Sequence, residues 1–470
     1  MNPKYRNLFI AIFILSLALR LGLTLVNREA IDNHMEAVRL ILSTHQLPSL
    51  IDCRECFHPK LFYASAAALL GLLGIYDNNA QVVLVQLVNC LAGAITLVFA
   101  WKLIEEFPSK NDIVKLTTFA LLALNPKLIA VNSQATNDSF LILFCTAALF
   151  FAWRFLQKPG RMLFGAVVLI LLLAVSTKTT GWIAFAAIFL ALLLAAWAKG
   201  EQRKTFLFYV SMMTVGVLAL TTIDPLSQFI SNYQKYGSPI TNTRPAMPMP
   251  AFFKQISSYK GYYFRPGIVS IQDGFLTFKF IDLLRYPLIG TETNDIASYP
   301  PQRTSFWTLL YADSQSLHFQ NWPRSWETSG LQGFDLSRGI FILGLLPAFI
   351  FIVGFFLEIF IFLRSFFSHD LRNADDHGLW LAATCGYILF LLLFALLFRD
   401  FSFIKFVYIL PGLPAFAWVF LRGAEKVYGY LARSRWATVL VYGAIVALLA
   451  LYVLDVTTLI LQLNPINIHF

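Results

Sequence analysis

The stretch NSQATNDSFLILFCTAALFFAWRFLQ (132–157) places two polar residues, Asn137 and Asp138, directly before a long apolar run. The run has the length of about 20 residues that a helix needs to cross the hydrocarbon core of a bilayer. A carboxylate at the edge of such a run is costly where it faces lipid. The stretch therefore predicts a membrane-spanning helix that opens with an acid of functional or capping importance.

The same pattern recurs along the chain. Of its 470 residues, 58% are hydrophobic and 13% are charged, whereas soluble domains carry about 25% charged residues. This composition predicts an all-α polytopic membrane protein. The apolar runs lie at 8–26, 60–76, 81–101, 113–131, 139–157, 161–177, 181–198, 205–223, 339–363, 379–398, 404–421 and 436–462.

The net charge of +10 sits mostly in short basic clusters between apolar runs. That is the orientation signal of membrane proteins, so we expect membrane lipids and no nucleic acid among the partners. One set of alternate loops is rich in Lys and Arg, while the opposite set carries only Lys127, Lys178, Arg399 and Lys405. This predicts a protein of the cytoplasmic (inner) membrane, with its N-terminus in the cytoplasm and the less apolar region 224–338 outside.

The short, alanine-rich segment 60–76 leaves two readings open. It either crosses the membrane or lies on its outer surface as an amphipathic or re-entrant element. The second reading is favoured because the segment is shorter and weaker than its neighbours. It places Asp32 and Asp138 on one side and gives about eleven spans. The predicted organisation is an N-terminal catalytic module, 1–223, with an outward loop at 27–80, an extracytoplasmic region, 224–338, and a C-terminal bundle, 339–470.

With this topology the unusual polar residues gather on the outer side. Ionisable residues at membrane depth are candidates for function. A carboxylate can take a proton from an acceptor nucleophile, and Lys or Arg can offset the charge on a departing lipid phosphate. The candidates are Asp32, His34, His58, Lys60, Asn137, Asp138, Lys178, Arg399 and Lys405.

Other readings apply to each residue. Asp32 and Asp138 suit helix caps, and single lysines often extend to lipid headgroups. Cys53 and Cys56 favour a local disulfide over a metal site in an outward loop. No cofactor is demanded, and a divalent metal held by Asp32, His34 and Asp138 stays open.

Several motifs in order carry a family likeness. They are DNHMEAVR (32–39), FHPKLFY (57–63), TNDSF (136–140), STKTTGW (176–182), NYQKYGSPITN (232–242) and KFVYILPGLP (405–414). Together they resemble the membrane glycosyltransferases of the GT-C class. More narrowly, they are similar to the bacterial dolichyl-phosphate-mannose-protein mannosyltransferase-like and aminoarabinose-transferase-like group, which uses polyprenyl-phosphate sugars.

This resemblance implies roles for individual residues. Asp32 matches the base toward the acceptor, although Asn33 stands where a second acid is usual. Asp138 matches a carboxylate that shapes the site beside Asn137. The resemblance further implies contacts to the lipid phosphate or substrate from His58, Lys60, Lys178 and Lys405, with Arg399 a weaker match.

The implied function is transfer of a hexosyl or pentosyl group from a polyprenyl-phosphate donor to a lipid, protein or glycan acceptor at the outer face of the membrane. The main alternative is a transporter or flippase of envelope lipids or glycans. Arg20, Glu358 and Asp455, which lie inside apolar runs, are the residues that favour the alternative.

Overall fold

The computed structural model describes residues 3–27, 33–49, 52–53, 55–109, 111–198, 202–222, 230–231, 233–234, 241–243, 246–248, 271–287, 304–316, 330–367, 374–398 and 404–463. Two predicted site residues, Asp32 and Arg399, lie outside these ranges, as does most of the region 224–338. The predicted domain boundaries therefore stay predictions.

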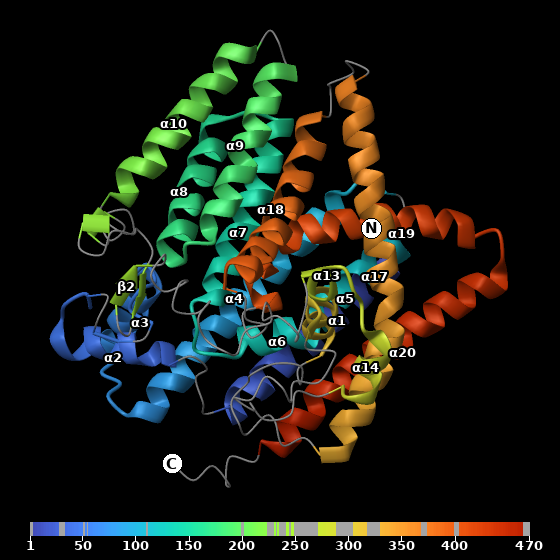
Figure 1. Ribbon diagram of the computed structural model, residues 1–470, viewed down its shortest axis with the longest axis horizontal. Helices are drawn as coiled ribbons and strands as arrows, with labels where there is room; N and C mark the ends of the chain where they lie inside the picture. Colours follow the sequence, from blue (N-terminus) through green and yellow to red (C-terminus); the bar gives the residue numbers. More distant parts are fainter. Residues whose placement is uncertain are drawn as a thin grey trace.

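The described part of the chain is almost entirely helical, which confirms the predicted all-α class (Figure 1). One small antiparallel hairpin, β1 (Thr241–Thr243) with β2 (Ala246–Pro248), was not predicted. The long helices are α1 (Pro3–Val26), α4 (Asn78–Glu106), α7 (Asp138–Gln157), α8 (Arg161–Thr177), α9 (Gly181–Ala198), α10 (Arg203–Thr221), α17 (Gly330–Phe367), α18 (Ala374–Phe398), α19 (Leu413–Leu431) and α20 (Arg435–Gln462).

Among the described helices, eight are long and apolar enough to cross a bilayer, and one bent pair makes a ninth. This confirms a multi-pass membrane architecture. Two further predicted spans do not qualify by length and composition. Helix α8 is apolar but has 17 residues, and the second half of α19 carries Arg422, Glu425 and Lys426.

The bent pair replaces the continuous span predicted at 113–131. It consists of α5 (Asp112–Ala123) and α6 (Pro126–Asn132), which meet at 50°. A proline disfavours the helical conformation in the residue before it, and Asn125 accordingly has an extended ψ of 121°. The Asn125 side chain accepts a hydrogen bond from the Leu128 amide at 3.0 Å, which caps the new helix.

Arg20 of α1 packs against this break and is fully buried. Its Nη1 donates to the Ala123 carbonyl at 2.9 Å and its Nε to Asn132 Oδ1 at 3.1 Å. A broken helix leaves carbonyls without their usual partners, and such groups must be satisfied inside a membrane protein. The contacts of Arg20 are therefore those of a structural residue.

The structure also departs from the single continuous span that was predicted at 404–421. Residues before Leu413 form two short 3-10 turns, η7 (Phe406–Tyr408) and η8 (Leu410–Gly412), and the α-helix continues instead to Leu431. Pro411 and Pro414 lack amide hydrogens and restrict their neighbours, which explains why the regular helix begins late.

The first predicted outward loop contains two short helices, α2 (His34–Thr44) and α3 (Leu61–Leu72), which pack on each other. At 12 residues, α3 is about 18 Å long, well short of a hydrocarbon core of about 30 Å. It cannot cross alone, as expected for the non-crossing reading of 60–76. Further short helices, α13 (Ile271–Phe275), α14 (Phe280–Arg285) and α15 (Phe306–Gln315), come from the predicted outer region.

Helices α17 and α19 cross at two glycines (Figure 1). A Cβ atom added to Gly354 would overlap the Val419 carbonyl oxygen, and one added to Gly423 would overlap that of Ile350. The backbones touch directly, so any side chain here must push the helices apart.

Gly423→Ala should therefore destabilise the protein by about 1–3 kcal/mol or more through overpacking. Gly429→Ala is the matched control, because Gly429 of the same helix has open space around it and alanine favours the helix. Thermal unfolding in detergent measures both. Equal melting temperatures for the two variants would contradict the close crossing.

Candidate active site

The centre of the site is an ion pair between the first residue of α7 and the residue that follows α8. Lys178 Nζ lies 2.6 Å from Asp138 Oδ1, and both residues are buried. Asp138 is not the N-cap of α7, which is Asn137, but it is the acid of the first helical turn, where the helix dipole favours a negative charge. Burial lowers the pKa of Lys178, but Asp138 and Tyr408 outweigh burial, and the net direction is upward. Lys178 is therefore a protonated cation.

The loop before α7 is fixed by hydrogen bonds from two other helices. Asn89 of α4 donates to the carbonyls of Gln134 at 2.6 Å and Thr136 at 2.7 Å. Asn27, at the end of α1, donates to the Ser133 carbonyl at 3.3 Å. The chain thus enters the loop after α1, which was predicted to face outward, beside the start of α7, so the two loops lie at the same end of the bundle.

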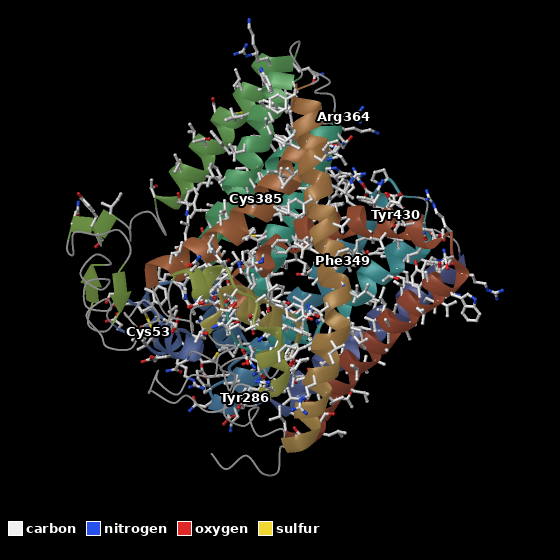
Figure 2. All side chains as sticks on the ribbon, turned by 45° about the vertical axis from the view of Figure 1, so that its right-hand side comes forward. Cys53, Tyr286, Phe349, Arg364, Cys385 and Tyr430 are labelled. Atoms are coloured by element: carbon white, nitrogen blue, oxygen red, sulfur yellow. A yellow bond between two sulfur atoms is a disulfide. The ribbon has the colours of Figure 1, made fainter. Side chains whose placement is uncertain are left out.

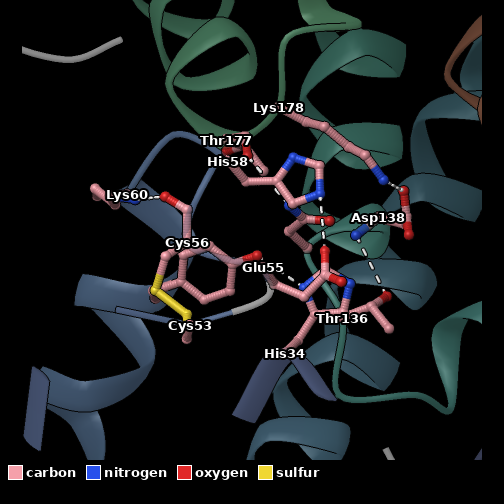
Figure 3. Close-up of polar contacts among 12 residues, drawn as sticks. His34, Cys53, Glu55, Cys56, His58, Lys60, Thr136, Asp138, Thr177 and Lys178 are labelled. Atoms are coloured by element: carbon pink, nitrogen blue, oxygen red, sulfur yellow. Dashed lines mark hydrogen bonds and ion pairs between the residues drawn. A yellow bond between two sulfur atoms is a disulfide. The ribbon is translucent and has the colours of Figure 1, made fainter. Parts of the chain in front are cut away.

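The segment between α2 and α3 brings further polar groups to this end (Figure 3). Cys53 and Cys56 form the predicted disulfide. Glu55 Oε2 lies 3.4 Å from His58 Nε2, and both residues are buried. Lys60, the N-cap of α3, donates from Nζ to the Cys56 carbonyl.

His34 opens α2 and faces the same cluster. Its Nδ1 is 2.8 Å from the Tyr63 hydroxyl, and its ring is stacked 5.8 Å from that of His58. Burial lowers the pKa of His34 to about 4; Glu55 and Asp138 raise it, while His58 and Lys178 lower it. His34 is therefore a neutral hydrogen-bonding group at neutral pH.

The 3-10 segment before α19 also contacts the site, through Tyr408. Lys178 Nζ lies 5.6 Å from the centroid of the Tyr408 ring, within the range of a cation–π contact. The backbone of this segment is held by Asp313 of α15, whose Oδ2 accepts from the Phe406 amide at 2.6 Å. Asp313 also pairs with Lys127 of α6, and both are buried.

The structure brings most of the predicted residues together. His34, His58, Lys60, Asn137, Asp138 and Lys178 lie around one end of α7 and α8 (Figure 3). Asn137 is buried and donates from Nδ2 to the Thr177 carbonyl at 3.4 Å. Lys405 is the N-cap of η7, and its charge acts on Asp313. Asp32 and Arg399 are outside the described residues, so their roles stay predictions.

Three contributors were not predicted from sequence: Glu55, Tyr63 and Tyr408. Glu55 stands inside the CxxC motif and Tyr63 inside FHPKLFY, so position within a motif was the available signal. Within the described ranges, no three His, Cys, Asp or Glu residues are grouped to hold a metal ion. The predicted metal set includes Asp32, which those ranges omit.

Sequence comparison gives one family match. A family model described as dolichyl-phosphate-mannose-protein mannosyltransferase matches residues 72–236, a range that includes Asp138 and Lys178. No curated protein matches the chain.

Structural comparison gives the fold. The Archaeoglobus fulgidus oligosaccharyltransferase in complex with zinc and sulfate matches with a TM-score of 0.51 and 11% identity, over 96% of this chain and 53% of that chain. The oligosaccharyltransferase AglB from the same organism, in complex with an inhibitory peptide and a dolichol-phosphate, also matches with a TM-score of 0.51. It is 11% identical over 97% of this chain and 56% of that chain. This chain spans about half the length of these archaeal proteins.

ArnT from Cupriavidus metallidurans bound to undecaprenyl phosphate is 16% identical over 91% of this chain and 78% of that chain, with a TM-score of 0.36. The archaeal likeness shows a fold shared with these oligosaccharyltransferases. With the family match, it confirms the resemblance that the motifs indicated, and more narrowly the likeness to the dolichyl-phosphate-mannose-protein mannosyltransferases.

Because His34 is neutral in the folded protein and has a pKa of about 6.5 when unfolded, its titration affects stability. As pH falls from about 6.5 to 4, the unfolded chain takes up the proton first, so the folded state loses about 3 kcal/mol of stability if the folded pKa is about 4. Melting temperatures between pH 4 and 8 measure this loss. His34→Gln should flatten the curve, and an unchanged slope in that variant would contradict the burial of His34.

Proposed function

We propose that this chain is a GT-C glycosyltransferase that moves a sugar from a polyprenyl-phosphate donor to an acceptor at the outer face of the cytoplasmic membrane. The observation that carries the proposal is the buried Asp138–Lys178 pair, gathered with His34, Glu55 and His58 at one end of the helical bundle. The family match over 72–236 supports it. So does the archaeal relative bound to a dolichol-phosphate.

The donor side is argued from the cations. A departing lipid phosphate needs positive charge placed where its own charge develops. Lys178 offers a buried ammonium that Asp138 keeps charged and aimed, and Lys60 offers a second at the start of α3. Lys405 contributes from the segment that carries Tyr408.

The acceptor side rests on Asp32. In this proposal Asp32 takes the proton of an acceptor hydroxyl, the oxygen attacks the anomeric carbon with inversion, and the sugar–phosphate bond breaks to release polyprenyl phosphate. The next residue, Asn33, adopts a left-handed conformation with φ 53° and directs its side chain to Glu36. An asparagine accepts this conformation, and unusual backbone conformations often mark functional sites.

Two of the three residues that favour the transporter alternative, Arg20 and Glu358, make contacts that hold the structure together. Arg20 serves the broken helix α5–α6. Glu358 of α17 lies 2.6 Å from His377 Nδ1 and 3.5 Å from Arg422 Nε, which ties α17 to α18 and α19. Contacts of this kind hold helices together and do not mark a transport path.

Asp32→Asn should lower kcat by about a hundredfold or more, the usual contribution of a general base, while the melting temperature stays unchanged. The assay is transfer from a labelled polyprenyl-phosphate sugar library to membrane extracts. Glu36→Gln, a nearby carboxylate of α2, is the control and should remain active. Full activity of Asp32→Asn would remove Asp32 as the base.

Lys178→Met should raise the apparent KM for the donor about tenfold or more, since a hydrogen bond to a charged group contributes about 1.5–3 kcal/mol. Removing one partner of a buried pair also destabilises, so Asp138→Asn/Lys178→Met is measured in parallel. This double variant should recover stability but not donor affinity. Arg154→Met, at the opposite end of α7 where Arg154 pairs with Glu106, is the control. An unchanged KM in both Lys178 variants would contradict the phosphate contact.

A further inference from the structure

The Cys53–Cys56 disulfide lies in the segment that connects α2 to α3, and it packs against residues of both helices. Cys53 and Cys56 are fully buried among Met35, Phe62 and Tyr63. The bond therefore lies in the small apolar core that holds α2 against α3. A disulfide restricts the conformations open to the residues it encloses, and one of them here is Glu55, which contacts His58 of the candidate site.

Two candidate substrate-binding residues are attached directly to this loop (Figure 3). Glu55, enclosed between the cysteines, contacts His58 through its carboxylate at 3.4 Å. The carbonyl of Cys56 accepts the hydrogen bond from Lys60 Nζ. The positions of an imidazole and an ammonium group thus depend on the backbone between residues 53 and 56.

The described residues of this loop, 52–53 and 55–60, form turns and bends. Two turn contacts run along its backbone, from the Cys56 amide to the Cys53 carbonyl at 3.4 Å and from the His58 amide to the Glu55 carbonyl at 3.2 Å. Both are long for N–H···O bonds. The covalent bond between Cys53 and Cys56 restrains this backbone beyond what the turns do.

We propose that the Cys53–Cys56 disulfide is a positioning element of the active site, which sets the places of His58 and Lys60 for the donor phosphate. This rests on the proposed function. Loss of the disulfide then weakens donor binding, because the groups that meet the phosphate are no longer preorganised. The cysteines touch no donor; they act through Glu55 and the Cys56 carbonyl.

The test is the affinity of the purified full-length protein for undecaprenyl phosphate in detergent, with melting temperature as a second readout. Cys53→Ser/Cys56→Ser should raise Kd about tenfold, since small misplacements of binding groups are costly. Cys385→Ser is the control; this free cysteine lies on α18, apart from Cys53 in Figure 2. It should leave Kd unchanged.

A merely structural role is separated by a mutant cycle. If the disulfide acts through Lys60, then Cys53→Ser/Cys56→Ser should add little to the Kd of Lys60→Met. The positioning role is overturned if the effects of the cysteine changes and of Lys60→Met on Kd add in full, or if Kd is unchanged in the double cysteine variant. In either case the proposed function stands. Failure of the unaltered protein to bind undecaprenyl phosphate overturns the donor assignment and this inference with it.

Discussion

The site depends on one buried ion pair, Asp138 with Lys178. Burying either charge alone would be strongly unfavourable, whereas the pair offsets much of that cost when its geometry is good. The pair forms because the start of α7 meets the end of α8 at the same end of the bundle. The pair holds the charged ammonium group of Lys178 in a fixed orientation at the ends of apolar helices. Recognition of a lipid phosphate needs such an arrangement.

The rest of the scaffold holds that meeting point from both sides. On one side, Asn89 and Asn27 hold the loop before α7, and Arg20 stabilises the break between α5 and α6. On the other, the Lys127–Asp313 pair fixes the segment that brings Tyr408 to Lys178. Irregular backbone is tolerated within membrane proteins where other parts of the protein satisfy it, and the loop before α7, the α5–α6 break and the segment before α19 receive hydrogen bonds of this kind.

Sequence periodicity predicted most helices, because apolar runs of bilayer length are a strong signal. It missed the bend at Asn125–Pro126, although a proline inside a run is a readable warning. The gathering of Asp138, Lys178 and His58 was predicted from topology and resemblance. Glu55 and the Lys127–Asp313 pair were not, since pairings between distant residues such as the latter leave no local pattern and depend on how the helices pack.

The most direct test is a cryo-electron microscopy structure of the protein in lipid nanodiscs with undecaprenyl phosphate. The phosphate should lie within hydrogen-bonding reach of Lys178 Nζ, beside Asp138, His58 and the segment before α19, with the lipid tail passing between helices. A phosphate bound at the opposite end of the bundle, or a bound lipid that leaves the Asp138–Lys178 end empty, would contradict the account.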